Sequence, residues 1–262
     1  MKFGGTSVES QEAIARVTSI VKAQQHRHPI VVVSAMGKTT NKLLTAATEA
    51  AAGRRDQALV VVDALRAHHL LHGLALAGPS AADLDRYIRT HFDWLDELVK
   101  GLSVVGELSP RSMDAIASVG ERLSSLVVSF AFRAAGLAAE HVDARRVIVT
   151  DDRFTQAQPL LEETYALLKE RVRPIAETSV VVMGGFIAAT EDGHTTTLGR
   201  GGSDFSAAIV AAGIDAEEIQ IWTDVDGMLT ADPRIMPGGR RVKSISFAEA
   251  SEMAYFGAKV LH

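Results

Sequence analysis

The sequence has no cysteine among its 262 residues. Disulfides, thiolate metal sites and a cysteine nucleophile are therefore excluded, and the composition fits a reducing compartment. An excess of basic charge is also missing, because 32 acidic residues outnumber 27 basic ones and the formal net charge is −5. A protein that neutralises nucleic-acid phosphates needs a basic surface, so we expect no nucleic-acid partner. A small anionic ligand remains compatible, since a few well-placed cations bind it.

Long hydrophobic runs are absent as well. No uninterrupted apolar run approaches the roughly 20 residues that a membrane span requires. Met1 is followed by a lysine, a phenylalanine and two glycines rather than by the apolar core of a signal peptide. We therefore expect a cytoplasmic protein with no membrane partner. A hydrophobic fraction of 47% in a chain of this length is sufficient for a large core.

Short apolar runs alternate with longer stretches of helical spacing. From residue 41 to about 119 the pattern is mostly helical, rich in Ala and Leu, with a break near Gly78-Pro79-Ser80. Strands that alternate with helices predict an α/β fold with a parallel sheet covered on both faces. The runs that predict buried strands are 30–33, 147–149, 180–183 and 219–222.

The segment VVVSAMGKTT, residues 31–40, contains a possible phosphate loop. Gly37-Lys38-Thr39 matches the end of a Walker A loop. The first glycine of that loop would have to replace Val32, which lies inside a predicted strand. A P-loop is therefore excluded, and another part of the chain must hold any phosphate.

Two glycine-rich turns and one acidic turn follow predicted strands. In KFGGTSVES, Gly4 and Gly5 leave the backbone open to a phosphate, and Thr6 or Ser7 is placed to cap the next helix. In TTTLGRGGSD, Arg200 lies between glycines, Ser203 is a good N-cap, and Gly213 closes the helix. The stretch 219–235 carries acidic residues that suit Mg²⁺, namely Asp224, Asp226 and Asp232.

Each of these turns alone is more typical of an ordinary tight turn than of a ligand site. Three of them, each after a predicted strand, favour a ligand site at the carboxyl edge of a parallel sheet. Other residues keep two interpretations. Glu121 and Arg122 could form a surface ion pair on a helix, Phe186 and Trp222 could be core residues, and Ser246 with Glu249 could open a helix as a capping box. We interpret the histidines as exposed or core residues, without a metal.

Motifs in the same order as in a known family run through essentially the whole chain. The chain resembles the aspartate kinases, within the amino acid kinase family, and the resemblance implies a three-layer αβα sandwich around a mostly parallel sheet. It also implies transfer of the ATP γ-phosphoryl group to the β-carboxylate of L-aspartate with Mg²⁺, at the entry to lysine, threonine and methionine synthesis. The motifs are KFGGTSV (2–8), SVGERLSS (118–125), GFIAAT (185–190), TTTLGRGGSD (195–204), WTDVDG (222–227), TADPR (230–234) and FGAKVLH (256–262).

The resemblance assigns roles to particular residues. Lys2 and Lys259 would bind the transferred and neighbouring phosphates from two sides, and Arg200 would bind the α-carboxylate of aspartate. Glu121 and Asp204 would face the amine of the substrate, and Asp204 is counted with the two lysines as catalytic. The remaining substrate-binding residues are Ser34, Ala35, Thr40, Phe186 and Ser203, and the nucleotide-binding residues are Gly4, Gly5, Thr223, Asp224, Leu229 and Arg234.

The domain organisation follows from the same resemblance. Residues 1–262 would form one kinase domain, with an amino-acid lobe at about 1–200 and a nucleotide lobe at about 201–262. The regulatory modules that follow FGAKVLH in the family are absent, so we expect any homodimer to form through the kinase domain. Two alternatives remain: a sister kinase that acts on glutamate or acetylglutamate, and a fragment that binds nucleotide or amino acid without turnover.

Overall fold

The computed structural model describes residues 1–223, 227–229 and 240–255. Contacts within the chain divide it into two compact units, Met1–Trp222 and Thr223–His262. The predicted boundary near residue 200 separates an amino-acid lobe from a nucleotide lobe, whereas the boundary at Trp222 separates groups of residues in contact. The predicted lobes stay a prediction. All strands of the described residues belong to the first unit.

A parallel sheet of five strands lies at the centre of the first unit, in the order β3-β5-β2-β1-β8. A second sheet has the order β4-β6-β7, and its β6–β7 pair is antiparallel. The strands are β1 (Lys2–Phe3), β2 (Ile30–Val33), β3 (Ala139–Val142), β4 (Val149–Thr150), β5 (Val180–Gly184), β6 (Ile187–Thr190), β7 (Thr195–Thr197) and β8 (Ile221–Trp222).

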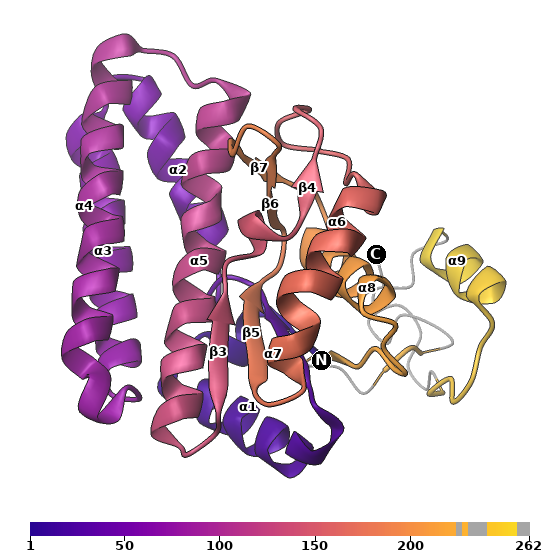
Figure 1. The fold of residues 1–262 in the computed structure, drawn as a ribbon. Coiled ribbons are helices and arrows are strands. Elements are labelled where there is room, and N and C mark those ends of the chain that lie inside the picture. Colours follow the sequence, from indigo (N-terminus) through magenta and orange to yellow (C-terminus); the bar gives the residue numbers. More distant parts are fainter. Residues whose placement is uncertain (224–226, 230–239, 256–262) are drawn as a thin grey trace. The chain divides into compact units, whose positions relative to one another are not determined.

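Helices cover both faces of the larger sheet, as Figure 1 shows. One face is covered by α1 (Gln11–Ala23) and α5 (Pro110–Ala134). The other face is covered by α6 (Leu161–Leu167), a π-helical turn (Leu168–Val172), α7 (Arg173–Ala176) and α8 (Gly202–Gly213).

Burial on both faces explains why β2 is entirely apolar. Val31 and Val33 belong to the hydrophobic core that contains α1 and α5. Ile30 and Val32 point the other way and belong to the core that contains α8. A strand buried on both faces has no position for a polar side chain. The predicted three-layer αβα sandwich with a mostly parallel sheet is confirmed.

Three further helices pack beside α5 and form the predicted helical region. They are joined by short turns, including a 3-10 turn at Gly78–Ser80 where the sequence predicts a break. The region extends past the predicted end at 119, because α5 continues to Ala134. The helices are α2 (Thr39–Ala51), α3 (Arg55–Leu74) and α4 (Ala81–Val105), shown on the left of Figure 1.

Helix α5 is long and apolar enough to cross a membrane by length and composition alone. In its most apolar window 83% of the residues are buried inside the fold. A central core helix passes the same test, and α5 contacts β2, β3 and β5 of the sheet. Its apolar character is therefore explained by packing.

Four local predictions are wrong in their boundaries. The strand predicted at 147–149 begins only at Val149, because Ala144–Arg146 forms a 3-10 turn just before it. The strand predicted at 219–222 is reduced to β8. Helix α1 is capped by Ser10, because a 3-10 turn at Gly5–Val8 occupies the positions expected to cap it. Gly201, with φ of 75°, is the N-cap of α8, so Ser203 lies inside its first turn.

The described part of the second unit is small. Leu229 and Arg241 form an antiparallel bridge, and Val242 N donates to Met228 O at 2.8 Å. Helix α9 (Phe247–Tyr255) begins with the predicted capping box. Ser246 N donates to Glu249 Oε2 at 2.9 Å, and Glu249 N donates to Ser246 Oγ at 3.3 Å.

A further short 3-10 turn, Gln25–Arg27, belongs to the first unit.

Candidate active site

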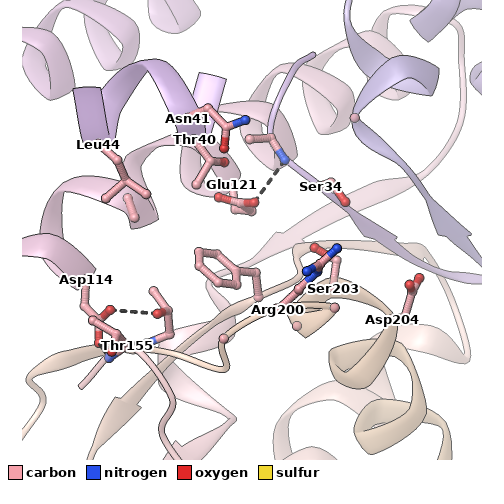
Figure 2. A pocket seen from close by; sticks show the side chains of 18 of the residues that line it. Ser34, Thr40, Asn41, Leu44, Asp114, Glu121, Thr155, Arg200, Ser203 and Asp204 are labelled. Carbon is pink, nitrogen blue, oxygen red and sulfur yellow. Dashed lines mark hydrogen bonds between the residues drawn. The ribbon is translucent and has the colours of Figure 1, made fainter. Parts of the chain in front are cut away.

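A cavity of about 570 Å³ lies in the first unit, next to the carboxyl ends of β1, β2 and β5. Ten of the predicted site residues line it, which Figure 2 shows from close by. One wall carries Ser34, Thr40 and Glu121, and the facing wall carries Arg200, Ser203 and Asp204. The ten residues are Lys2, Gly5, Ser34, Ala35, Thr40, Glu121, Phe186, Arg200, Ser203 and Asp204.

Glu121 is a buried charged residue of this cavity, with 3% of its surface exposed. Its Oε1 accepts a hydrogen bond from Ala35 N at 3.2 Å. Gly120 permits this approach, because a Cβ there would lie 2.8 Å from Ala35 Cβ. Oε2 is buried and has no hydrogen-bond partner among the described residues. Burial raises the pKa of Glu121 to about 8.

The surface ion pair between Glu121 and Arg122 does not form. Arg122 lines a different cavity on the other side of the same stretch of α5. The interpretation of Glu121 as an ordinary surface residue is therefore wrong. A buried carboxyl with one free oxygen is instead suited to receive a donor from a ligand.

Lys2 on β1 and Asp204 in the first turn of α8 form an ion pair. Lys2 Nζ lies 2.8 Å from Asp204 Oδ1, with the side chains 12% and 31% exposed. A Cβ at Gly4 would meet only this lysine, at 3.8 Å, so the backbone there is open. Gly5 has a packing requirement of its own, because a Cβ would lie 2.8 Å from Gly37 O. A phosphate contact by either glycine stays a prediction.

Arg200 is presented by a loop of unusual backbone conformation. Gly199 and Gly201 on either side have φ of 74° and 75°, which glycine adopts without strain. Arg200 is exposed, lines the cavity and makes no ion pair with the described residues. The loop places a planar guanidinium where a carboxylate or phosphate can reach it.

Phe186 also has a left-handed backbone, with φ of 65°. Its N–H donates to Ser206 Oγ at 2.8 Å, which fixes the end of β5 against α8. Gly202 makes room for the ring, since a Cβ there would lie 2.8 Å from Phe186 Cδ2. A strained residue held in this way at a cavity is typical of a functional position.

Sequence reasoning missed Asp114, which also lines the cavity and is 1% exposed. Its Oδ2 accepts from Thr155 N at 2.8 Å and Thr197 N at 3.0 Å, and its Oδ1 accepts from Thr197 Oγ1 at 2.7 Å. Burial raises the pKa of Asp114 above its ordinary value, against the effect of these donors. A usable signal exists, because Asp114 and Glu121 are seven residues apart and share one face of a helix.

We expect Asp114→Ala to destabilise the protein by about 2–3 kcal/mol, because it leaves the buried N–H groups of Thr155 and Thr197 without their acceptor. The measurement is urea unfolding at neutral pH. Asp192→Ala, at an exposed turn, is the matched control and should change stability by less than about 0.5 kcal/mol. Equal effects of the two substitutions would show that the hydrogen bonds of Asp114 do not hold the cavity wall.

The predicted nucleotide-binding residues do not all fall on described positions. Thr223 and Leu229 belong to the second unit, and Leu229 forms the bridge to Arg241. Asp224, Arg234 and Lys259 lie outside the described residues, as do Asp226 and Asp232. Among the residues that the structure describes, no three His, Asp or Glu side chains are grouped as a metal site.

The fold and the cavity define a class of protein: a parallel α/β protein with a cavity lined by charged side chains at the carboxyl edge of its sheet, where this class binds ligands. The model of the amino acid kinase family matches residues 1–262. The chain belongs to the amino acid kinase family.

Individual relatives narrow this similarity to the aspartate kinases, as the sequence motifs predict. The chain is 39% identical to aspartokinase 2, chloroplastic, of Arabidopsis thaliana over 267 residues, covering 100% of this chain and 48% of the relative. It is 36% identical to lysine-sensitive aspartokinase 3 of Escherichia coli (strain K12), covering 100% of this chain and 56% of that one. The chain spans about half the length of these curated relatives.

A solved structure shows the same similarity in three dimensions. The crystal structure of E. coli aspartokinase III in complex with aspartate and ADP superposes with a TM-score of 0.91 at 36% identity. The match covers 100% of this chain and 57% of the other. A structure of Clostridium acetobutylicum aspartate kinase gives a TM-score of 0.73 at 25% identity, covering 97% of this chain and 54% of the other.

Proposed function

We propose that this chain phosphorylates the β-carboxylate of L-aspartate with ATP. The observation that carries the proposal is the charge arrangement of the cavity, where Lys2 and Arg200 accompany a buried Glu121 with one free oxygen. Aspartate has two carboxylates and one ammonium, so its pocket needs charges of both signs. The match to a structure that binds aspartate and ADP supports the same ligand class.

The α-carboxylate and the ammonium of the substrate each have a partner in this arrangement. Arg200 binds the α-carboxylate through its planar fork. Glu121 Oε2 accepts from the ammonium, which favours the ionised carboxylate of Glu121 over its protonated form. Ala35 N–H, already bonded to Oε1, keeps the carboxyl in place for this contact. Lys2 then remains for the phosphoryl oxygens.

The reaction needs no general base from the protein. The β-carboxylate is already ionised at neutral pH, so one of its oxygens attacks the γ-phosphorus directly. The new bond joins that oxygen to phosphorus, the bond from the γ-phosphorus to the β–γ bridging oxygen breaks, and ADP leaves with the electron pair. The protein contributes alignment and neutralises charge on the transferred group.

Magnesium is part of the proposal through the nucleotide. Mg²⁺ bound with ATP supplies positive charge to the β- and γ-phosphates. The carboxylates suited to it by sequence are Asp224, Asp226 and Asp232, outside the described residues. The acyl phosphate produced is the entry to lysine, threonine and methionine synthesis, which we include in the proposal.

The test is trapping of the product with hydroxylamine, which converts an acyl phosphate into a hydroxamate. With ATP and Mg²⁺ we expect the signal with L-aspartate to exceed that with L-glutamate by about tenfold or more, since one methylene in a shaped pocket changes specificity by that order. A signal with glutamate alone would assign the chain to a sister kinase. No signal and no ATP binding by calorimetry would overturn the kinase proposal.

A further inference from the structure

A second cavity, of about 610 Å³, adjoins the same helix that forms the candidate active site. Helix α5 contributes Glu121 to the active-site cavity and the next residue, Arg122, to this one. The other walls come from α4, from β3 and the turn that follows it, from the π-helical turn and α7, and from β5 and β6. Between the two cavities the backbone of β5 packs closely against that of α5, because a Cβ at Gly184 would lie 2.9 Å from Glu121 O.

Arginines dominate the charge of this second cavity. Four of them line it, Arg122, Arg133, Arg146 and Arg171, against two carboxylates, Glu140 and Asp143. The carboxylate of Asp143 is already paired with Arg145, which does not line the cavity. Arg145 Nε donates to Asp143 Oδ1 at 3.0 Å, and Arg145 Nη2 donates to Asp143 Oδ2 at 2.6 Å. Glu140 is exposed. The cavity therefore has an excess of positive charge.

Arg122 is the residue whose environment asks for a ligand. It is half-buried, and no oxygen atom of the described residues accepts a hydrogen bond or forms an ion pair with its guanidinium. Burial, and then the neighbouring charge of Arg145, lower the pKa of Arg122 to about 10, against the opposite effect of the Asp143 carboxylate. The nearby carboxylate of Asp143 is bonded to Arg145 and makes no ion pair with Arg122. A guanidinium taken partly out of water with no anion in contact is costly, and an anion that enters the cavity would offset that cost.

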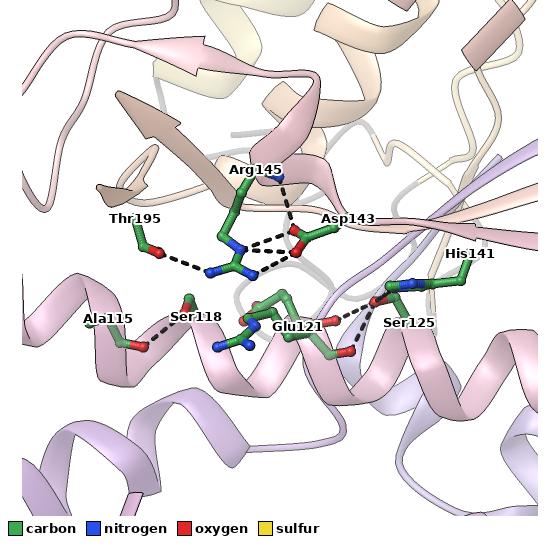
Figure 3. A network of polar contacts seen from close by, with 9 residues as sticks. Ala115, Ser118, Glu121, Ser125, His141, Asp143, Arg145 and Thr195 are labelled. Atoms are coloured by element: carbon green, nitrogen blue, oxygen red, sulfur yellow. Dashed lines mark hydrogen bonds and ion pairs between the residues drawn. The ribbon is translucent and has the colours of Figure 1, made fainter. Parts of the chain in front are cut away.

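The walls around Arg122 are held in place by a hydrogen-bond network, which Figure 3 shows. Ser125 Oγ donates to Glu121 O at 2.8 Å and lies 3.0 Å from His141 Nε2. Arg145 Nη1 donates to Thr195 Oγ1 at 3.1 Å, which ties the Asp143–Arg145 pair to β7. A site built on fixed side chains loses little entropy when a ligand binds.

We propose that this arginine cavity binds a small anion that carries two or more phosphate or carboxylate groups. Arg122 at the half-buried position forms the central contact, and the exposed Arg146 and Arg171 contact the outer part of the ligand. Guanidinium forks match such groups in a bidentate way. The cavity volume suits a metabolite rather than a macromolecule. The proposal concerns a site separate from the one that binds aspartate.

The test is calorimetric titration of the whole chain with pyrophosphate and, in a parallel arm, with citrate, both without Mg²⁺. We expect binding that Arg122→Gln weakens about tenfold or more, as loss of a charged hydrogen bond implies. Arg146→Gln, at an exposed position, should weaken it less and provides a variant whose folding is not at issue. The matched control is Arg16→Gln on the exposed side of α1, which removes the same charge and should leave binding unchanged.

A second control distinguishes anion binding in the arginine cavity from anion binding in the active-site cavity. Lys2→Met should remove only binding at the active-site cavity and leave the component that depends on Arg122. Pyrophosphate binding without citrate binding would identify phosphate as the recognised group, and the reverse would identify carboxylate. Binding of neither anion, or isotherms unchanged by both arginine variants, would overturn the proposal. A change in sedimentation mass alone with Arg122→Gln would make the cavity a contact between subunits, and would overturn it too.

Discussion

Replacing Lys2 by methionine is expected to lower kcat by about 10²–10³-fold in the hydroxamate assay, the effect of removing one preorganised donor from a developing charge. Two consequences of the substitution act together. The phosphoryl group loses its cation, and Asp204 loses the ammonium that lies 2.8 Å from it. An unpaired carboxylate beside the transferred group would repel it. Methionine keeps the length and the apolar stem of the side chain, so β1 should still pair with its neighbours.

The matched control for this experiment is Lys22→Met. Lys22 is exposed at the end of α1, where its Nζ donates to Ala135 O at 3.3 Å. We expect kcat to stay within twofold of wild type. Thermal unfolding of both variants distinguishes loss of the phosphoryl contact from loss of fold. A fully active Lys2→Met enzyme would remove Lys2 from the catalytic residues.

Glu121→Gln is expected to raise the KM for aspartate by about 100-fold, because it removes one partner of a buried charge pair. Glutamine keeps the carbonyl that can accept from Ala35 N but presents an amide to the substrate ammonium. In the wild-type enzyme the KM for aspartate should fall as pH rises toward 8, since the ionised carboxylate is the binding form. Steady-state kinetics at several pH values measure both effects.

The same residue predicts an effect on stability with the opposite pH dependence. The pKa of Glu121 is about 8 in the folded chain against an ordinary 4.5, so the folded state binds the extra proton between those values. The contribution of the protonated Glu121 to the stability of the fold is fully present below about pH 4.5 and is lost as pH rises through 8. In Glu121→Gln the side chain does not titrate, so the stability of the variant does not change with pH through this residue. The difference in unfolding free energy, variant minus wild type, should therefore rise by on the order of 1 kcal/mol per pH unit across this window.

Urea unfolding at pH 5, 6.5 and 8 measures this slope, and other titrating groups cancel because both proteins contain them. Glu107→Gln, at an exposed position before α5, is the control and should follow the wild-type curve. A Glu121→Gln curve parallel to wild type would mean that the Glu121 pKa is ordinary.

The central strands of the fold could be predicted because their sequences have a single explanation. IVVV in β2 and VVVM in β5 are apolar at every position, and only burial on both faces accounts for that. Strand β3 was missed because it is an edge strand whose sequence, AEHV, is buried only at Ala139. The short strands β6 and β7 have too few residues for a period to be visible.

The candidate site was predictable to the extent that its residues follow strands. Lys2, Ser34 and Phe186 come directly after or within β1, β2 and β5, and parallel topology brings these ends together. Asp114 could not be assigned in this way, because its partners Thr155 and Thr197 are distant in sequence and are brought to it by tertiary packing. An ion pair between Glu121 and Arg122 remained an open alternative, since spacing alone does not show that adjacent residues on α5 enter different cavities. The roles of the site residues stay predictions.

The pairing of β1 has a consequence for biosynthesis. Lys2 is in register with Val32 on one side and with Ile221 on the other. A ribosome adds about 5–20 residues per second, so on the order of 10–40 s pass between synthesis of Lys2 and of its second partner strand. During that interval β1 is an edge strand with unpaired backbone groups, open to pairing with other chains. The strand that carries the lysine therefore gains its second neighbour only late in synthesis, and its length of two residues limits what another chain could pair with in the meantime.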